Sequence, residues 1–104
     1  MTFEEKLEAF RSRLEQEQGE SLKQRHPTLF GSEEYKKKSW AATLVGGKKY
    51  TKVNVGDSGK YMVDNQTEEI FGILGYGKIN KKKPAGTLDT IADWDWSGWH
   101  ARKK

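Results

Sequence analysis

The chain contains no cysteine, which excludes disulfide bonds, thiolate nucleophiles and cysteine-based zinc sites together. It also has no run approaching the roughly 18 apolar residues that a membrane-spanning helix needs. Its first residues, MTFEEKLEAF, lack the basic start and apolar centre of a signal peptide. We therefore expect a soluble cytoplasmic protein that does not contact a membrane.

Apolar residues are scarce, at 34%, and charged residues are abundant, at 33%. The apolar share is concentrated in aromatic rings, with four residues each of Trp, Tyr and Phe, and such rings bury much area per residue. The 104 residues match the size of one domain, and two halves would be too small for separate cores. We predict a single domain over residues 1–104, with a helix over 1–25, a sheet over 39–91 and a tryptophan-rich tail over 92–104.

The first 25 residues carry the pattern of an amphipathic helix. Thr2 and Glu5 fit a capping box, in which each side chain bonds the backbone N–H of the other residue. Apolar residues then recur at spacings of four, three and four, on one helix face: Phe3, Leu7, Phe10 and Leu14. The helix could end at Gly19 as a left-handed cap, or the stripe could continue one turn to Leu22. In either case the helix extends no further than His26, because this residue precedes a proline.

The next segment, residues 27–38, has no apolar stripe. Ser32 is followed by two glutamates and then by Lys36–Lys38, so the charges match the dipole of a short helix. We predict one or two helical turns here.

From residue 39 the pattern changes to that of strands. Residues 40–45 (WAATLV) and 48–55 (KKYTKVNV) are joined by a Gly-Gly pair, which is typical of a two-residue hairpin turn. In that register Val45 lies opposite Lys48. The predicted buried face carries Trp40, Ala42, Leu44, Thr51, Val53 and Val55, and the predicted solvent face carries Thr43, Tyr50, Lys52 and Asn54. A helix over residues 40–45 is the alternative.

A second hairpin is predicted within residues 59–77. Two apolar runs, Tyr61–Val63 and Ile70–Leu74, flank the segment Asp64–Thr67, whose side chains favour a tight reversal. Glycines in and after the last run indicate bulges and bends: Gly72, Gly75 and Gly77. The predicted fold class is therefore α+β, with an N-terminal amphipathic helix packed on an antiparallel meander of four to five strands. A bent last strand could curl this sheet towards a small open barrel.

Basic residues cluster in four segments, Lys36–Lys38, Lys48–Lys49, Lys81–Lys83 and Arg102–Lys104, and the net charge of +4 permits contact with an acidic partner. Residues 78–84 (KINKKKP) are predicted to form an exposed basic loop, followed by a short edge strand over 87–91. Lysines on phosphates and rings under bases are the elements of a single-stranded nucleic-acid site. The candidate binding residues are Lys48, Lys49, Tyr50, Lys52, Lys81, Lys82 and Lys83, with Tyr61 and Tyr76 as further rings. The alternative is that these lysines keep loops and sheet edges soluble and block edge-to-edge pairing.

Three of the four tryptophans lie within six residues of the tail, at Trp94, Trp96 and Trp99. Rings near a terminus can close a core by folding back over it. Tryptophans are also enriched among the residues that dominate protein interfaces, so a binding surface is the second interpretation.

Acidic residues offer one spacing worth testing as a metal site, that of Asp89, Asp93 and Asp95. Two or three carboxylates can hold Mg²⁺ for phosphoryl transfer. The rest of such an enzyme is not recognisable, and neither a catalytic triad nor a phosphate-binding loop is present in the sequence. We expect a protein that is not an enzyme, with no catalytic residues, no metal and no cofactor.

The segments SGKYMVD, EIFGI, GYG and GTLDT, which lie between residues 58 and 90, resemble small uncharacterised proteins of tailed bacteriophages. The resemblance implies a phage or prophage source and therefore the cytoplasm of a bacterial host cell, and it carries no functional residue. The function that we expect is binding of nucleic acid, or of a host protein that handles nucleic acid, through a basic, aromatic-bearing face. The alternative is an anti-defence or host-takeover protein that blocks a bacterial protein through the Trp-rich edge.

Overall fold

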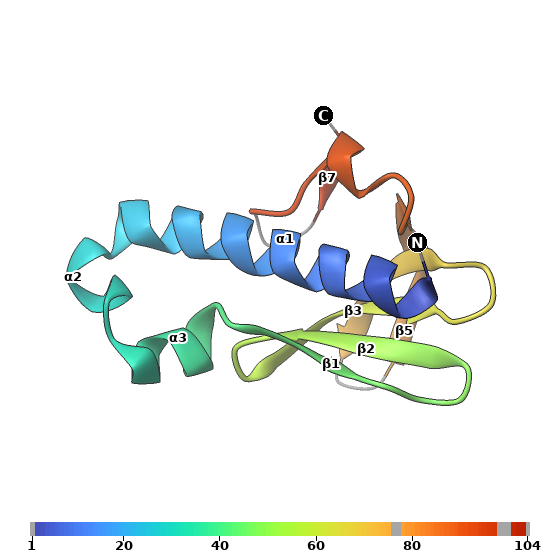
Figure 1. Cartoon of the computed structure of the whole chain (residues 1–104), viewed down its shortest axis with the longest axis horizontal. Helices are drawn as coiled ribbons and strands as arrows, with labels where there is room; N and C mark the ends of the chain where they lie inside the picture. Colours follow the sequence, from blue (N-terminus) through green and yellow to red (C-terminus); the bar gives the residue numbers. More distant parts are fainter. Residues whose placement is uncertain (1, 76–77, 98–100, 104) are drawn as a thin grey trace.

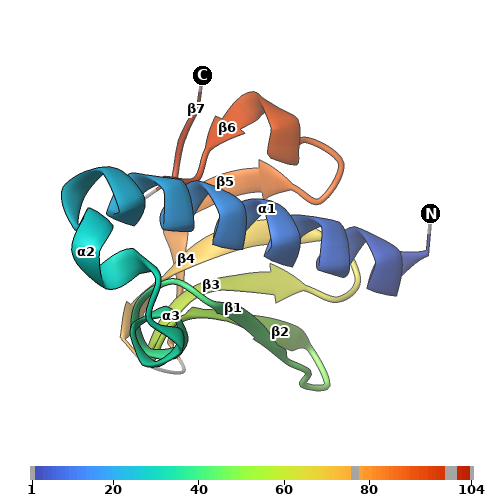
Figure 2. The same ribbon diagram turned by 60° about the vertical axis from the view of Figure 1, so that its left-hand side comes forward.

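The protein, described here from a computed structural model, has one long helix lying across one face of a five-stranded antiparallel sheet (Figure 1). The structure describes residues 2–75, 78–97 and 101–103. The elements are α1 (Phe3–Arg25), α2 (Pro27–Phe30), α3 (Glu33–Ser39), β1 (Ala42–Val45), β2 (Tyr50–Val55), β3 (Ser58–Asp64), β4 (Glu69–Gly75), β5 (Lys78–Thr87), a 3₁₀ turn η1 (Ile91–Asp93), β6 (Trp94–Asp95) and β7 (Arg102–Lys103). The sheet order is β1-β2-β3-β4-β5, and β6 and β7 form a separate two-stranded ribbon (Figure 2). The predicted α+β class is confirmed, and the sheet stays open.

Helix α1 begins with the predicted capping box. The Glu5 amide donates to Thr2 Oγ1 at 3.2 Å, and the Thr2 amide donates to Glu5 Oε1 at 3.3 Å. The helix continues through Gly19 and ends at Arg25, so of the two alternatives the cap at Gly19 is excluded. His26 caps its end, and the proline that follows starts α2.

The core lies between α1 and the sheet and is built around aromatic rings. Phe10 is fully buried, and its ring centroid lies 4.7 Å from that of Trp96 and 6.0 Å from that of Tyr61. Tyr61 and Trp96 meet edge-to-face at 5.3 Å. Each such pair adds about 0.5–1.5 kcal/mol beyond the area that it buries. The other buried residues of this cluster are Leu7, Leu14, Val53, Val55, Val63, Ile70, Ala85 and Leu88.

A close approach of Trp40 explains why α1 tolerates a glycine in its interior. A Cβ atom on Gly19 would lie 2.7 Å from Cε3 of Trp40. The Trp40 ring also stacks on Phe30, with centroids 4.8 Å apart and planes 9° apart. The missing side chain therefore lets the Trp40 ring, at the end of α3, pack close to the second half of α1.

Helix α3 matches the prediction of one or two helical turns, whereas α2 was not predicted. In α3 the Ser32 hydroxyl accepts from the Tyr35 amide and caps the first turn. The turn between β2 and β3 contacts the end of this helix, because the Asp57 amide donates to Lys38 O at 3.2 Å. Gly56 has a φ of +61°, and a Cβ atom there would collide with the Lys38 carbonyl. Only glycine fits this turn without strain.

The hairpin of β1 and β2 has the predicted faces but not the predicted register. Val45 pairs with Lys52 rather than Lys48, and strand β1 begins at Ala42. A shift of an even number of residues keeps each side chain on its face, so Ala42, Val53 and Val55 are buried as expected. The longer loop is held by Asn65. Its side-chain Nδ2 donates to the carbonyls of Gly47 and Lys48, and its backbone N–H donates to that of Lys49. The alternative of a helix over residues 40–45 is excluded.

The β3–β4 hairpin forms as predicted. Tyr61, Met62 and Val63 pair with Gly72, Phe71 and Ile70, respectively. In the turn, Asp64 Oδ1 accepts from the amides of residues 66 and 67, at 2.8 and 3.0 Å. The irregular pairings of β4 fall at or beside Gly72 and Gly75, as the glycines indicated, while Gly77 lies outside the described residues.

The prediction of a basic loop over residues 78–84 is wrong, because this segment forms most of strand β5. Its lysines and Pro84 are typical of an edge strand, which must avoid pairing with other chains. The predicted edge strand over 87–91 is also wrong, since only Thr87 belongs to a strand and the chain then turns into η1.

We predict that Gly19→Ala lowers the free energy of unfolding by about 1–3 kcal/mol, the usual cost of overpacking. The gain in helix propensity, about 1 kcal/mol, should be outweighed because the Trp40 ring is wedged between α1 and Phe30. Urea unfolding measures the change. Gly31→Ala is the matched control: Gly31 has a φ of −76° and no atom within 4 Å of an added Cβ, so a gain of about 0.4–1 kcal/mol is expected. Equal effects of the two substitutions would contradict the Trp40 contact.

Candidate nucleic-acid interface

The sheet face opposite α1 carries a row of side chains that crosses four strands. Lys52 on β2 pairs with Met62 on β3, which pairs with Phe71 on β4, which pairs with Pro84 on β5. Directly paired residues share one face of a sheet. Three strand spacings of about 4.8 Å give the row a length of about 14 Å. We call the face that carries this row the outer face.

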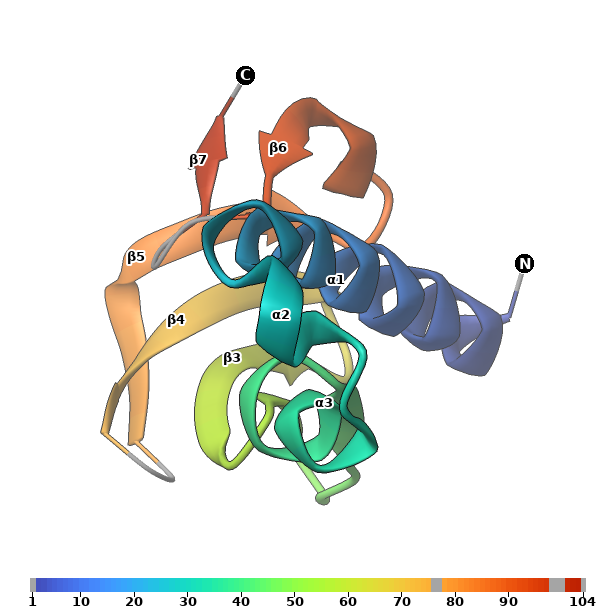
Figure 3. The ribbon, with the colours of Figure 1, turned by 90° about the vertical axis from the view of Figure 1, so that its left-hand side faces the viewer.

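The middle of the row is apolar and shielded. Met62 and Phe71 are only 7% and 8% exposed, although neither belongs to the core cluster under α1. Figure 3 shows that β4 and β5 bend strongly along their length, so the outer face is curled rather than flat. Phe71 is therefore part of the floor of this face and does not offer an open ring for base stacking.

The predicted lysines at residues 81–83 lie at one end of the row. Phe71 pairs with Pro84, whereas its neighbour Gly72 pairs with Asn80, so three residues of β5 bulge out between two successive pairs. These three residues are Lys81, Lys82 and Lys83. The bulge places their backbone beside Pro84, and the Lys82 side chain is exposed.

The other predicted basic residues lie at the β2 side of the face. Lys48 and Lys49 are exposed in the loop before β2, and Lys49 Nζ lies 5.5 Å from the centroid of the partly buried Tyr50 ring. Tyr50 and Lys52 alternate with buried residues of β2 and so share the outer face. The structure thus places Lys52 and the backbone of the bulge over residues 81–83 at opposite ends of the row, three strand spacings apart.

Lys60 is a further basic residue of this region that the sequence did not single out. It lies at an irregularity of the β2–β3 ladder, since Val53 pairs with Tyr61 but Asn54 pairs with Gly59. Burial lowers the pKa of Lys60 from its usual value. A bulge that depends on strand pairing has no local sequence signature, which is why this lysine was missed.

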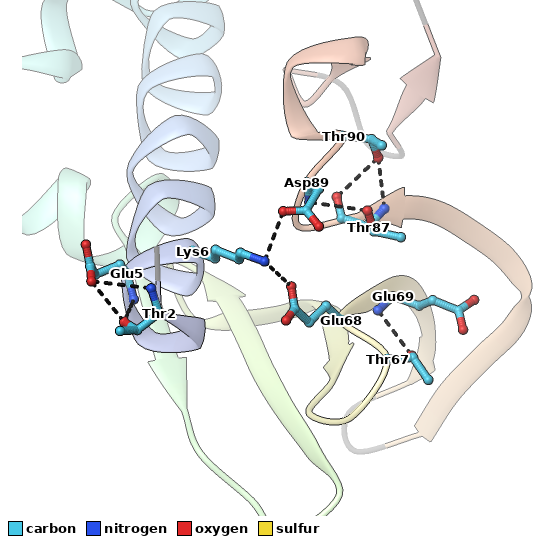
Figure 4. A network of polar contacts seen from close by, with 9 residues as sticks. All are labelled: Thr2, Glu5, Lys6, Thr67, Glu68, Glu69, Thr87, Asp89 and Thr90. Atoms are coloured by element: carbon cyan, nitrogen blue, oxygen red, sulfur yellow. Dashed lines mark hydrogen bonds and ion pairs between the residues drawn. The ribbon is translucent and has the colours of Figure 1, made fainter.

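Of the three acidic residues considered as a metal site, Asp93 is exposed and the other two have other partners; Figure 4 shows those of Asp89. The ammonium group of Lys6 forms two ion pairs, with Asp89 Oδ1 at 3.1 Å and with Glu68 Oε1 at 2.9 Å. The hydrogen bond that Lys6 donates to Glu68, followed by the one that it donates to Asp89, raises the pKa of Lys6. Asp95 Oδ1 accepts from the amide and hydroxyl of Ser97. Within residues 2–75, 78–97 and 101–103, no group of three or more His, Cys, Asp or Glu side chains could hold a metal ion.

Of the tail tryptophans, Trp96 belongs to the core and is not available as a binding residue. Its ring is fully buried. Its backbone N–H and C=O groups both form hydrogen bonds with side chains of α1. The Trp96 amide donates to Glu17 Oε1 at 3.1 Å, and its carbonyl accepts from Gln18 Nε2 at 2.5 Å. Trp94 is partly buried against the same cluster, and Trp99 lies outside the described residues.

Tyr61, considered as an exposed ring for stacking, is instead 3% exposed in the core. Burial raises the pKa of Tyr61 to about 12, the charge of Asp95 acts in the same direction, and the backbone of Ala101 opposes both. Of the predicted rings, only Tyr50 is placed on the outer face, and Tyr76 lies outside the described residues.

Comparisons with known proteins add no relative. No protein-family model matches the chain, and neither a curated protein nor a solved structure matches it. In the part of the chain that the structure describes, no helix has both the length and the apolar character needed to cross a membrane.

We predict that Tyr61 makes the protein less stable at alkaline pH. The pKa of Tyr61 is about 12 in the folded state and 10.0 in the unfolded chain, so the unfolded chain loses the phenol proton first as the pH rises. The contribution of Tyr61 to the free energy of unfolding is therefore fully present below pH 10 and is lost between pH 10 and 12. At 1.36 kcal/mol per unit the loss is about 2–3 kcal/mol. Urea unfolding across this range should show a flatter decline for Tyr61→Phe than for the wild type. Ile70→Val, another buried change, should lower stability by a similar amount at every pH. Parallel curves for Tyr61→Phe and the wild type would refute the assignment.

Proposed function

We propose that this protein is a non-enzymatic binding protein that contacts single-stranded nucleic acid through its outer face. The observation that carries the proposal is the row from Lys52 through Met62 and Phe71 to Pro84. It joins the lysines before and within β2 to the lysine bulge of β5 across one face. A strand of nucleic acid laid along this row would meet positive charge at both ends and an apolar floor between them.

The physical support is electrostatic more than aromatic. Lysines that neutralise phosphates release condensed counterions, and this term supplies most of non-specific binding. Lys60, on the neighbouring strand β3, adds a further cation to the same sheet. Tyr50, beside Lys49, is the described ring best placed to contact a base.

The setting that we propose follows from the resemblance to tailed-bacteriophage proteins. The nucleic acid, or a protein that handles it, would then be met in the cytoplasm of a bacterial host. The alternative of a protein that blocks a partner through a Trp-rich edge is weakened, because Trp96 is fully buried and cannot contact a partner. The alternative of a metal-dependent enzyme is weakened, because Asp89, one of its three candidate metal ligands, forms an ion pair with Lys6. We therefore propose neither.

The test measures fluorescence anisotropy of a labelled oligothymidine of about 12 nucleotides, within the usual site sizes for such proteins. We expect binding at low salt that weakens steeply as salt rises. Lys49→Gln with Lys52→Gln should weaken binding and reduce the log–log salt slope by about 1.4, or about 0.7 for each lost phosphate contact.

The matched control is Arg102→Gln with Lys103→Gln, which removes the same charge from two exposed residues of β7. This pair should leave the salt slope nearly unchanged. Equal losses in both double variants would show that net charge alone attracts the oligonucleotide. No binding of the wild type at low salt would overturn the proposal.

A further inference from the structure

Strand β1 is one of the two edges of the five-stranded sheet, and it is short and uncharged. Its four residues are ATLV, and Val45 is 47% exposed. Edge strands present N–H and C=O groups that can pair with another chain. The opposite edge, β5, carries a lysine bulge and a proline that interrupt such pairing. Strand β1 has neither device.

Two side chains of α1 instead reach the free edge of β1 at Ala42. The Ala42 amide donates to Glu15 Oε1 at 3.0 Å. The Ala42 carbonyl accepts from Arg11 Nη1 at 3.2 Å. Arg11 Nη1 also lies 3.4 Å from Glu15 Oε1, so the two side chains and one backbone residue form a closed set of contacts.

This arrangement reproduces what a neighbouring strand would supply. In an antiparallel ladder, a hydrogen-bonded pair exchanges one N–H···O bond in each direction. Arg11 provides the donor and Glu15 the acceptor of such a pair, from a helix instead of a strand. An incoming strand would have to displace both before it could pair with Ala42.

Arg11 is held in place from its other side. Its Nε donates to both carboxylate oxygens of Glu8, at 3.0 and 2.8 Å, and Nη2 donates to Glu8 Oε1 at 2.5 Å. The hydrogen bond to Glu8 is also the largest cause of a raised Arg11 pKa. Bidentate contacts of this kind fix the orientation of the guanidinium plane. Nη1 is therefore aimed at the β1 edge by the fork that binds Glu8.

The open part of the edge points to its partner. Because Ala42 faces outward and strand residues alternate, the Leu44 amide and carbonyl face outward as well. No charged side chain of β1 would repel an identical strand. An antiparallel pair of β1 strands around a two-fold axis would join two sheets through the same residues of each chain.

We propose that Arg11 and Glu15 guard the β1 edge against antiparallel pairing with the β1 edge of a second copy of this chain. The guard keeps β1 the last strand of the sheet while α1 stays docked. Any event that lifts the first half of α1 from the sheet exposes a strand edge ready for homotypic pairing.

The test compares the oligomeric state of variants by sedimentation at increasing protein concentration. We expect the wild type to sediment as a monomer, and Arg11→Ala with Glu15→Ala to reach twice the chain mass. In the dimer, the Leu44 amide should exchange its hydrogen more slowly. Adding Val45→Lys to the double variant places like charges in the new interface and should restore the monomer.

A conservative variant separates the guard from general damage. Glu15→Gln keeps an oxygen that accepts from Ala42, so it should remain monomeric. If the double variant does not fold, Glu15→Ala alone should show the same concentration-dependent association at a higher concentration. A folded, monomeric double variant would overturn the proposal. So would a dimer that Val45→Lys leaves intact, or a wild type that already pairs through β1.

Discussion

The docking of α1 on the sheet is the constraint on which the rest of the structure depends. Phe10 makes the central contact, since its ring touches both Tyr61 of the sheet and Trp96 of the tail. The polar flanks of the same helix then reach three separate places. Lys6 binds the turns around Glu68 and Asp89, Arg11 and Glu15 meet the edge at Ala42, and Glu17 and Gln18 bond the backbone of Trp96. One helix thus organises the core, one sheet edge and the tail.

The same docking leaves the two faces of the sheet with different tasks. The inner face is occupied by α1 and by rings that have no further capacity to bind a partner. The outer face carries Lys52, and its apolar centre, Met62 and Phe71, is little exposed. Strands β4 and β5 bend along this face (Figure 3). A ligand is therefore expected to follow the charges across the strands, with little intercalation between rings.

Local chemistry made part of this fold predictable. The capping box of α1, its apolar stripe and the Asp64 turn are each encoded within a few residues, and each formed as predicted. The features that depend on distant partners were not predictable. The predicted two-residue Gly-Gly turn did not form. A longer loop takes its place, and Asn65 of the β3–β4 hairpin donates hydrogen bonds to its carbonyls. The run KINKKKP has too few apolar residues to signal a strand, yet β4 pairs with it. For the candidate site, the lysines and Tyr50 could be named from the sequence. The row that links Lys52 to Pro84, the position of Lys60 at a bulge and the burial of Trp96 and Tyr61 required the tertiary structure.

The central claim is that binding takes place on the sheet face away from α1. Titration of ¹⁵N-labelled protein with oligothymidine, followed residue by residue in NMR spectra, tests it most directly. The account predicts concerted chemical-shift changes at Tyr50, Lys52, Met62 and Lys82, with the amides of α1 unchanged. Changes confined to α1, or to the α2–α3 end of the molecule, would contradict it.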